Sequence, residues 1–396
     1  MQNAGPNSAL TSCIMSVMAP FLALDARAED VGVTDPFTLE AVYTADVLSN
    51  VRGGLETGAR YLDNLDLTLE IDGEQALGWQ DITFFVYGLY NNGTRFTETL
   101  VGDLHTVSNI ETGVSAVRLY EAWIDQRLWD DNVSLRAGLY DLNSEFDAID
   151  PAALFINSAH GIGTDFGQTG ENGPSIFPNT SLAFRIEAQV SGNWLLRAAV
   201  LDGVPGDPDH PKRTAIKLGN GDGALLVGEI NYAQGPFRAG LGAWRYTARF
   251  ADQMTGTARR GNDGVYGFVS AQVYAEPEDD QQGLSLFARL GRASRAFNDV
   301  GTYFGAGAVY RGLLPARPED EWGIAVAWAE TGTPFRQATG AEKREVNVEM
   351  TYRAPLHDFI TVQPVMQYIF NPGADPALKN ALVLGIRFEF AWRVDG

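Results

Sequence analysis

Arginine and glutamate residues alternate with apolar residues in several stretches of this chain. Arg136 lies between Leu135 and Ala137, and Arg185, Glu187 and Arg197 occur in two later stretches of the same kind. An arginine offers a planar fork of hydrogen-bond donors, and a carboxylate accepts two hydrogen bonds. Such a row suits weak binding of hydroxyl-rich or anionic solutes, and it also suits a structural ladder that holds a neighbouring segment.

Catalysis and metal chemistry have little support in the sequence. The four histidines all fall in predicted loops or turns. Ser158, His160 and Asp165 are close neighbours in the chain, whereas a catalytic triad is defined by its geometry in space. The single cysteine, Cys13, excludes an internal disulfide and a cysteine-based metal site. The chain is therefore not predicted to be an enzyme, and neither a metal nor another cofactor is expected.

The charge and the apolar content narrow the class of protein. The formal net charge is −21, from 50 acidic and 29 basic side chains, and such a balance disfavours nucleic acid as a partner. After the leader region we find no apolar run of the about 20 residues that a spanning helix needs. A membrane assignment must therefore rest on strands, in which alternate side chains point to opposite faces.

The charged positions belong to stretches with a two-residue period. In the last stretch, residues 382–392, every second side chain is large and apolar, while the alternate set includes Arg387 and Glu389. A packed sandwich core would not accept such charges unpaired. Sixteen stretches are predicted, near residues 40–48, 60–71, 82–90, 117–127, 133–140, 181–190, 194–202, 225–233, 236–246, 265–275, 284–292, 302–311, 321–330, 345–353, 359–369 and 381–392. The expected fold is all-β, a sixteen-stranded antiparallel transmembrane β-barrel.

The connections between these stretches alternate in length. Residues 191–193 and 234–235 are short turns, whereas 91–116, 141–180 and 202–223 are long. Short turns at one end and long loops at the other are typical of outer-membrane barrels. Both termini would then lie at the periplasmic end. A loop as long as 141–180 in a compact protein is expected to be functional, and we expect this third loop to fold inward and narrow the lumen.

The N-terminal segment has features of a leader. The stretch from Ala9 to Leu24 is mostly apolar, and Ala26-Arg27-Ala28 has the small-x-small pattern of a cleavage site. We predict a cleaved signal peptide at 1–28, a periplasmic segment at 29–39 and a barrel at 40–392.

Several short motifs resemble those of a known family. They are Tyr140-Asp141-Leu142-Asn143-Ser144-Glu145-Phe146-Asp147, Leu154-Phe155-Ile156-Asn157-Ser158, His160-Gly161-Ile162-Gly163, Gly173-Pro174-Ser175-Ile176-Phe177-Pro178, Tyr120-Glu121-Ala122-Trp123 and Tyr43-Thr44-Ala45-Asp46. In this order they resemble the carbohydrate-selective porins of the OprB type, over residues 40 to 392. The resemblance implies a sixteen-stranded barrel, passive uptake of sugars, and an eyelet in which arginines and acidic groups meet sugar hydroxyls. Two departures are the four residues after Trp392 and a leader without lysine or arginine before its apolar stretch.

Parity and position select the candidate eyelet residues. The predicted inward arginines on strands flanking the long loop are Arg136, Arg185 and Arg197, together with Glu187, and the loop residues proposed to face them are Asn143, Glu145 and Asp147. The alternative is that these charges only hold the loop to the wall. Four aromatic residues also have inward parity and could contact a sugar: Tyr140, Tyr266, Phe268 and Phe287. Between 117 and 126 the alternation shifts, which indicates a β-bulge and leaves Arg118 and Glu121 without a definite face.

The sequence thus predicts an outer-membrane porin for selective diffusion of carbohydrates, namely monosaccharides such as glucose and short oligosaccharides. One alternative is a general or anion-preferring porin, because inward arginines also attract anions. Another is a non-transporting structural or adhesion barrel. The expected partners are small neutral sugars, outer-membrane lipid and lipopolysaccharide, with monomer and homotrimer both left open.

Overall fold

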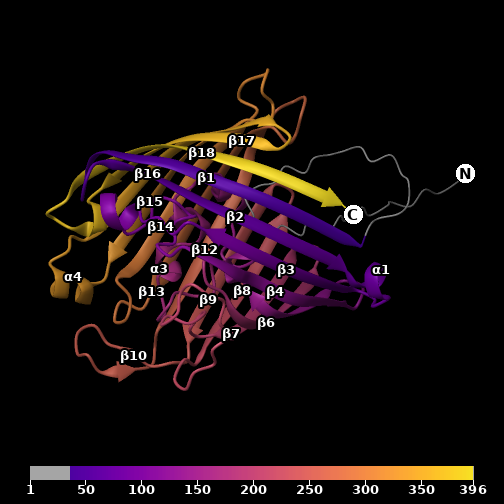
Figure 1. Ribbon diagram of the computed structural model, residues 1–396, viewed down its shortest axis with the longest axis horizontal. Coiled ribbons are helices and arrows are strands. Elements are labelled where there is room, and N and C mark those ends of the chain that lie inside the picture. The colour runs from indigo at the N-terminus through magenta and orange to yellow at the C-terminus, as the bar shows by residue number, and fades with distance from the viewer. Residues whose placement is uncertain (1–35, 396) are drawn as a thin grey trace, which may run out of the picture.

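A single wall of long strands forms the molecule (Figure 1). The computed structural model describes residues 36–395, so the predicted leader lies outside the described part. The wall strands are β1 (Phe37–Gly54), β2 (Gly58–Asp72), β3 (Ile82–Asn91), β4 (Ala116–Leu128), β5 (Val133–Tyr140), β6 (Ser181–Ser191), β7 (Trp194–Asp202), β8 (Ala224–Gln234), β9 (Phe237–Tyr246), β12 (Asp263–Ala275), β13 (Gly283–Ala293), β14 (Val300–Arg311), β15 (Glu321–Thr331), β16 (Arg344–His357), β17 (Ile360–Phe370) and β18 (Lys379–Asp395). Each of the sixteen predicted strands is present at its expected place.

The strands close into an antiparallel barrel. Each strand pairs with its neighbour in the chain, and β1 pairs with β18 to complete the circle. Between β9 and β12, the short strands β10 (Phe250–Ala251) and β11 (Ala258–Arg259) pair only with each other. Closure leaves no free sheet edge, which a membrane-embedded sheet requires.

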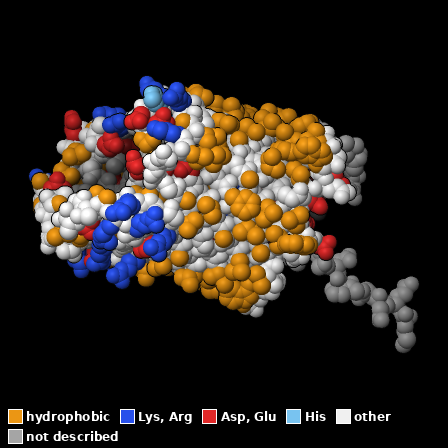
Figure 2. All heavy atoms as spheres, turned by 90° about the horizontal axis from the view of Figure 1, so that it is seen from below, with side chains coloured by type: hydrophobic (Ala, Val, Ile, Leu, Met, Phe, Trp, Pro, Cys, Tyr) orange, Lys and Arg blue, Asp and Glu red, His pale blue; other side chains and the backbone are white. Residues whose placement is uncertain are grey.

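The two faces of the wall differ as the alternation predicts. In β18, Leu384 and Trp392 are exposed on the outside, whereas Val383 and Arg387 are buried inside. Figure 2 shows apolar side chains spread over the flank of the barrel, with charged side chains gathered toward one end. No helix among residues 36–395 is long and apolar enough to cross a membrane.

Short helices lie in the connections. At the end near both described termini is α1 (Gly73–Leu77), and α4 (Thr333–Thr339) lies at the opposite end with β10 (Figure 1). The remaining helices are η1 (Thr97–Val101), η2 (Leu142–Ser144), η3 (Asp150–Leu154), α2 (Ser158–Gly161), α3 (Thr164–Gly167) and η4 (Pro372–Ala374). His357, which was expected in a turn, is instead the last residue of β16.

The irregular alternation in β4 is a bulge. Tyr87 of β3 pairs with Glu121 and the next residue, Gly88, pairs with Leu119, so Tyr120 is the extra residue. The bulge shifts the parity, and both Arg118 and Glu121 are buried as a result.

Candidate functional site

The third loop, residues 141–180 between β5 and β6, lies against the inner face of the wall. The backbone N–H groups of Ile156 and Asn157 donate to Glu349 on β16, at 2.8 and 2.9 Å. Tyr303 on β14 donates its hydroxyl to the carbonyl oxygen of Ala159, at 2.7 Å. The loop therefore starts at β5 and reaches strands on the far side of the barrel, so that it crosses the interior.

Aromatic side chains fill the space between the loop and the wall. Phe166 of α3 stacks on Trp244 of β9 with ring centroids 5.0 Å apart, and Phe155 contacts Phe287 at 5.9 Å. The four inward aromatics considered for sugar contact, Tyr140, Tyr266, Phe268 and Phe287, are all buried in this same cluster. Their parity was predicted correctly, but the loop covers them and they do not face an open passage.

Glu145 joins the start of the loop to β5 and β6. Arg185 donates Nε to Oε2 of Glu145 at 2.8 Å and Nη2 to Oε1 at 2.7 Å. Nη1 of Arg136 lies 3.4 Å from Oε1, and the Tyr140 hydroxyl donates to the same carboxylate. Burial favours the neutral acid, but the charges of Arg136, Arg185 and Arg197 outweigh it and lower the pKa of Glu145 to about 2.

A cross-strand row on β4, β5 and β6 explains why this carboxylate is needed. Asp125 lies opposite Arg136, and Arg136 lies directly opposite Arg185. Two like charges in that position repel each other. Oδ2 of Asp125 lies 3.0 Å from Nε of Arg136 and 3.0 Å from Nη2 of Arg185, so Asp125 and Glu145 each neutralise both guanidinium groups.

A second row connects Glu187, Arg197 and Glu229 on β6, β7 and β8. Nε of Arg197 donates to Oε2 of Glu187 at 2.5 Å, and its Nη1 donates to the carbonyl oxygen of Glu145 at 2.7 Å. Glu229 accepts the backbone N–H of Asp147 at 2.8 Å. This row therefore holds the loop by its backbone, whereas the first row holds the side chain of Glu145.

On the opposite wall, Arg289 of β13 binds two loop carboxylates. Its Nη2 lies 2.7 Å from Oδ2 of Asp147, and its Nη1 lies 2.6 Å from Oδ1 of Asp165. All three side chains are buried. A Cβ at Gly163 would lie 2.0 Å from Nη1 of Arg289, and one at Gly291 would lie 2.1 Å from Asp165. The absence of a side chain at these two positions makes room for the pair.

Exposure divides the candidate eyelet residues into two groups. The side chains of Arg197 and Glu187 are 19% and 24% exposed, and those of Arg136 and Glu145 are 10% and 13% exposed. We call these four the charged edge, because their side chains remain partly exposed.

The other three candidates support the loop. The side chain of Arg185 is only 2% exposed and that of Asp147 is fully buried. The side-chain amide of Asn143 donates to the carbonyl oxygens of Phe146 and Gly161, both at 3.1 Å. These residues hold the charged edge in place and do not themselves present donors to the lumen.

Two aromatic residues beside the charged edge were not predicted. The guanidinium carbon of Arg136 lies 3.7 Å from the ring centroid of Trp123, and Trp123 stacks on Phe85 at 4.8 Å. Asp125 was also missed. All three lie on β3 and β4, where the bulge obscures the parity, and the opposition of Asp125 and Arg136 follows only from the strand register.

The second loop, residues 92–115 between β3 and β4, also reaches the inner wall. Arg387 of β18 forms a bidentate pair with Asp46 of β1, at 2.7 and 2.8 Å, and donates to Asn109 of the loop at 2.7 Å. Gln367 of β17 donates to the carbonyl oxygen of Val107 at 2.8 Å. Both loops therefore contact the inner face of the wall.

Two histidines are buried where these loops meet. Nδ1 of His105 lies 2.8 Å from the hydroxyl of Thr164, and the ring of His160 contacts that of Phe155 at 5.1 Å. Burial lowers the pKa of His160 to about 3, and burial together with nearby His160 lowers the pKa of His105 to about 3. Among residues 36–395, no cluster of histidine, cysteine and acidic side chains is placed to hold a metal ion.

Known proteins share this architecture. Porin B of Pseudomonas aeruginosa is 26% identical, over 89% of this chain and 86% of that protein. The putative porin QuiX of Acinetobacter baylyi is 22% identical, over 87% of each. The high-pH structure of Pseudomonas putida OprB superposes with a TM-score of 0.80 at 22% identity, over 90% of this chain and 94% of that one. The last comparison establishes the fold.

The family comparison covers most of the barrel. Residues 56–392 match the family described as carbohydrate-selective porin, OprB family. This range includes the third loop and every residue of the charged edge. The chain belongs to the OprB family of carbohydrate-selective porins and is an outer-membrane channel for carbohydrates, not an enzyme.

Proposed function

We propose that small neutral carbohydrates, monosaccharides such as glucose and short oligosaccharides, diffuse passively along the charged edge formed by Arg136, Glu145, Glu187 and Arg197. The observation that carries this proposal is the alternation of partly exposed donors and acceptors beside the third loop. A sugar is covered in hydroxyl groups, each of which can both donate and accept. Such a surface can replace the water molecules that a sugar loses when it enters a narrow passage.

The mutual pairing of these residues favours weak binding. Each arginine already donates to a carboxylate, so a sugar can form hydrogen bonds only with the donors and acceptors that remain free. A channel needs such weak sites, because the solute must leave as readily as it enters.

The balance of charge argues for neutral solutes rather than anions. The two rows and the adjoining loop residue Glu145 contain three arginines, Arg136, Arg185 and Arg197, and four carboxyl groups, Asp125, Glu145, Glu187 and Glu229. The positive charge is therefore compensated by carboxylates of the wall and the third loop, which is unfavourable for an anion-preferring porin. The apolar side chains on the outside of the barrel are suited to contact membrane lipid, lipopolysaccharide or a second copy of the barrel. Both a monomer and a homotrimer are therefore compatible with this outer surface.

Conductance in planar bilayers tests the proposal. We expect glucose to reduce the ionic current, and Arg197→Ala to weaken this block about tenfold, because one charge-assisted hydrogen bond contributes roughly 1.5 kcal/mol. The matched control is Arg95→Ala, which breaks an exposed pair with Glu98 in the second loop (2.9 Å). If glucose does not reduce the current and the channel strongly prefers anions, the result would favour a general or anion-preferring porin. Conductance near zero would favour a structural barrel.

A further inference from the structure

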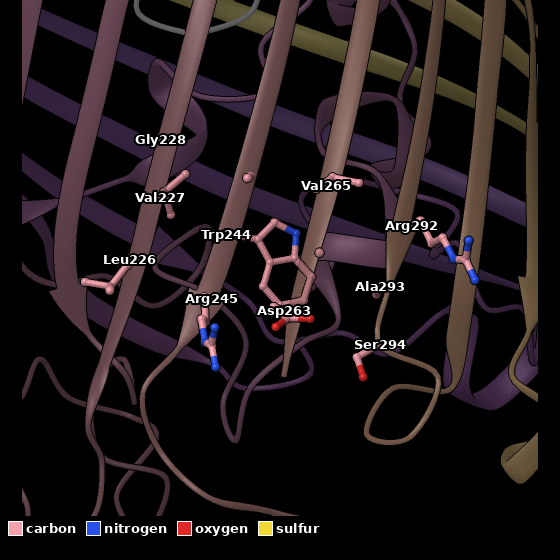
Figure 3. Close-up of a pocket in the computed structure, with 12 residues that line it drawn as sticks. Leu226, Val227, Gly228, Trp244, Arg245, Asp263, Val265, Arg292, Ala293 and Ser294 are labelled. Atoms are coloured by element: carbon pink, nitrogen blue, oxygen red, sulfur yellow. The ribbon is translucent and has the colours of Figure 1, made fainter. Parts of the chain in front are cut away.

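A groove runs across the outer wall near the long-loop end. It has a volume of about 710 Å³, and β8, β9, β12 and β13 contribute its lining (Figure 3). Gly228, Ala243 and Val265 lie side by side in its floor, because these residues are register partners on neighbouring strands. The groove forms here because Gly228 and Ala243, two small outward-facing residues, lie next to each other on neighbouring strands.

The groove continues toward the middle of the wall. A second hollow of about 630 Å³ shares Gly228, Ala243 and Val265 with the first and extends over β7 and β6. Outward leucine and isoleucine side chains border it, among them Ile230 and Leu241. The combined trough is apolar and open to the lipid side, which suits an extended hydrocarbon chain.

Basic side chains stand at the outer end of the groove. Arg245 and Arg292 are the last residues but one of β9 and β13, both at the long-loop end, and Figure 3 shows them on either side of Asp263. Both side chains are exposed, and neither has a hydrogen bond or ion pair among residues 36–395. Asp263 is the register partner of Arg245 and belongs to the same lining.

The following loop adds three arginines, Arg249, Arg259 and Arg260, all exposed. Arg259 is paired with Asp252 at 2.6 Å, while Arg249 donates only to the neutral carbonyl of Ala258. Figure 2 shows basic side chains gathered at the loop end, bordering the apolar belt. In a chain of net charge −21, this local excess of positive charge indicates an anionic partner at the membrane surface.

We propose that this trough and its arginines bind the phosphorylated, acylated glycolipid of the outer leaflet, lipopolysaccharide. An acyl chain lies along Gly228 and Ala243, and Arg245 and Arg292 bind phosphate oxygens on either side of Asp263. The arginine forks match phosphate oxygens, and the lipid places its phosphates at the depth where the apolar belt ends. The proposal rests on the outer-membrane location of the barrel and is independent of the sugar path.

Lipid binding by the full-length protein in detergent tests the site. Deep-rough lipopolysaccharide is titrated and the bound fraction is measured by native mass spectrometry. We expect the double variant Arg245→Gln/Arg292→Gln to bind about 30-fold more weakly, from the usual contribution of two basic residues at an anionic membrane surface. The control variant Lys212→Gln/Arg213→Gln removes the same charge from the exposed loop after β7 and should change binding less than threefold.

A groove variant separates the acyl-chain contact from the charge. Gly228→Leu adds a side chain to the floor, and its Cβ has room because the only atom within 4 Å is the carbonyl oxygen of Arg197, at 3.9 Å. It should weaken lipopolysaccharide binding while all arginines remain. Enzymatically dephosphorylated lipopolysaccharide should bind wild type and Arg245→Gln/Arg292→Gln equally.

Three results would overturn the proposal. The first is unchanged lipopolysaccharide binding in Arg245→Gln/Arg292→Gln. The second is loss of self-association in that variant with lipid binding intact, which would assign the surface to a second copy of the chain. The third is equal binding of phosphatidylglycerol, which would assign the arginines to anionic phospholipid in general. Glucose block measured on the same variant should match wild type, so failure here is distinct from failure of the proposed sugar path.

Discussion

Replacing Glu145 by glutamine removes the carboxylate with which the third loop binds Arg136 and Arg185. The shift of its pKa from 4.5 to about 2 corresponds to about 3 kcal/mol of interaction between the charged form and its surroundings. Glu145→Gln should therefore weaken loop docking on the order of a hundredfold. The side chain is only 13% exposed, so solvent screens little of this energy.

The effect has a defined pH dependence. Because the pKa of Glu145 is lower in the docked loop, its contribution is fully present above about pH 4.5 and is lost as the pH falls through about 2. Acid should therefore loosen the third loop in wild type over this range. In Glu145→Gln, the loosening of the third loop between about pH 4.5 and 2 should be absent.

Single-channel recording measures both consequences. We expect Glu145→Gln to show larger and more variable conductance, because the loop leaves the wall more often. The zero-current potential in a salt gradient should shift toward anions, since one of the four carboxylates that compensate Arg136, Arg185 and Arg197 is lost. Glu171→Gln, an exposed position on the same loop, is the matched control. If the two variants behave alike, Glu145 does not hold the loop and the reasoning is refuted.

Two further predictions concern the far side of the loop. Arg289→Ala leaves the buried carboxylate of Asp147 without its partner and should destabilise the docked loop by about 3–5 kcal/mol. Limited proteolysis should then cleave the third loop faster than in wild type. The control is Arg292→Ala, on the outer face of the same strand, which should leave cleavage unchanged. Burial lowers the pKa values of His105 and His160 to about 3, so their contribution to loop stability is present above about pH 6.5 and declines as the pH falls toward 3. His160→Phe should reduce the extra proteolysis that appears between pH 7 and 5, and an unchanged pH profile would exclude His160 as its source.

The alternation of side chains was sufficient to predict the wall. Each strand must present apolar groups to lipid and polar groups to water, and this requirement leaves a two-residue period in every strand. The inward parity of Arg136, Arg185 and Arg197 followed directly from it. The same local signal located the bulge in β4, because one extra residue there reverses the pattern.

The tertiary structure decided which inward residues remain available to a solute. Asp147 and Arg289 are 142 positions apart, and no local pattern specifies which strand of the wall a long loop will reach. Tyr266 has the same inward parity as Arg136 and Arg197, but the third loop covers it. The face on which a side chain lies depends on the backbone of its own strand, whereas its exposure depends on what folds against that strand. For this reason the sequence determined the barrel, and only the folded chain determined which residues line its open passage.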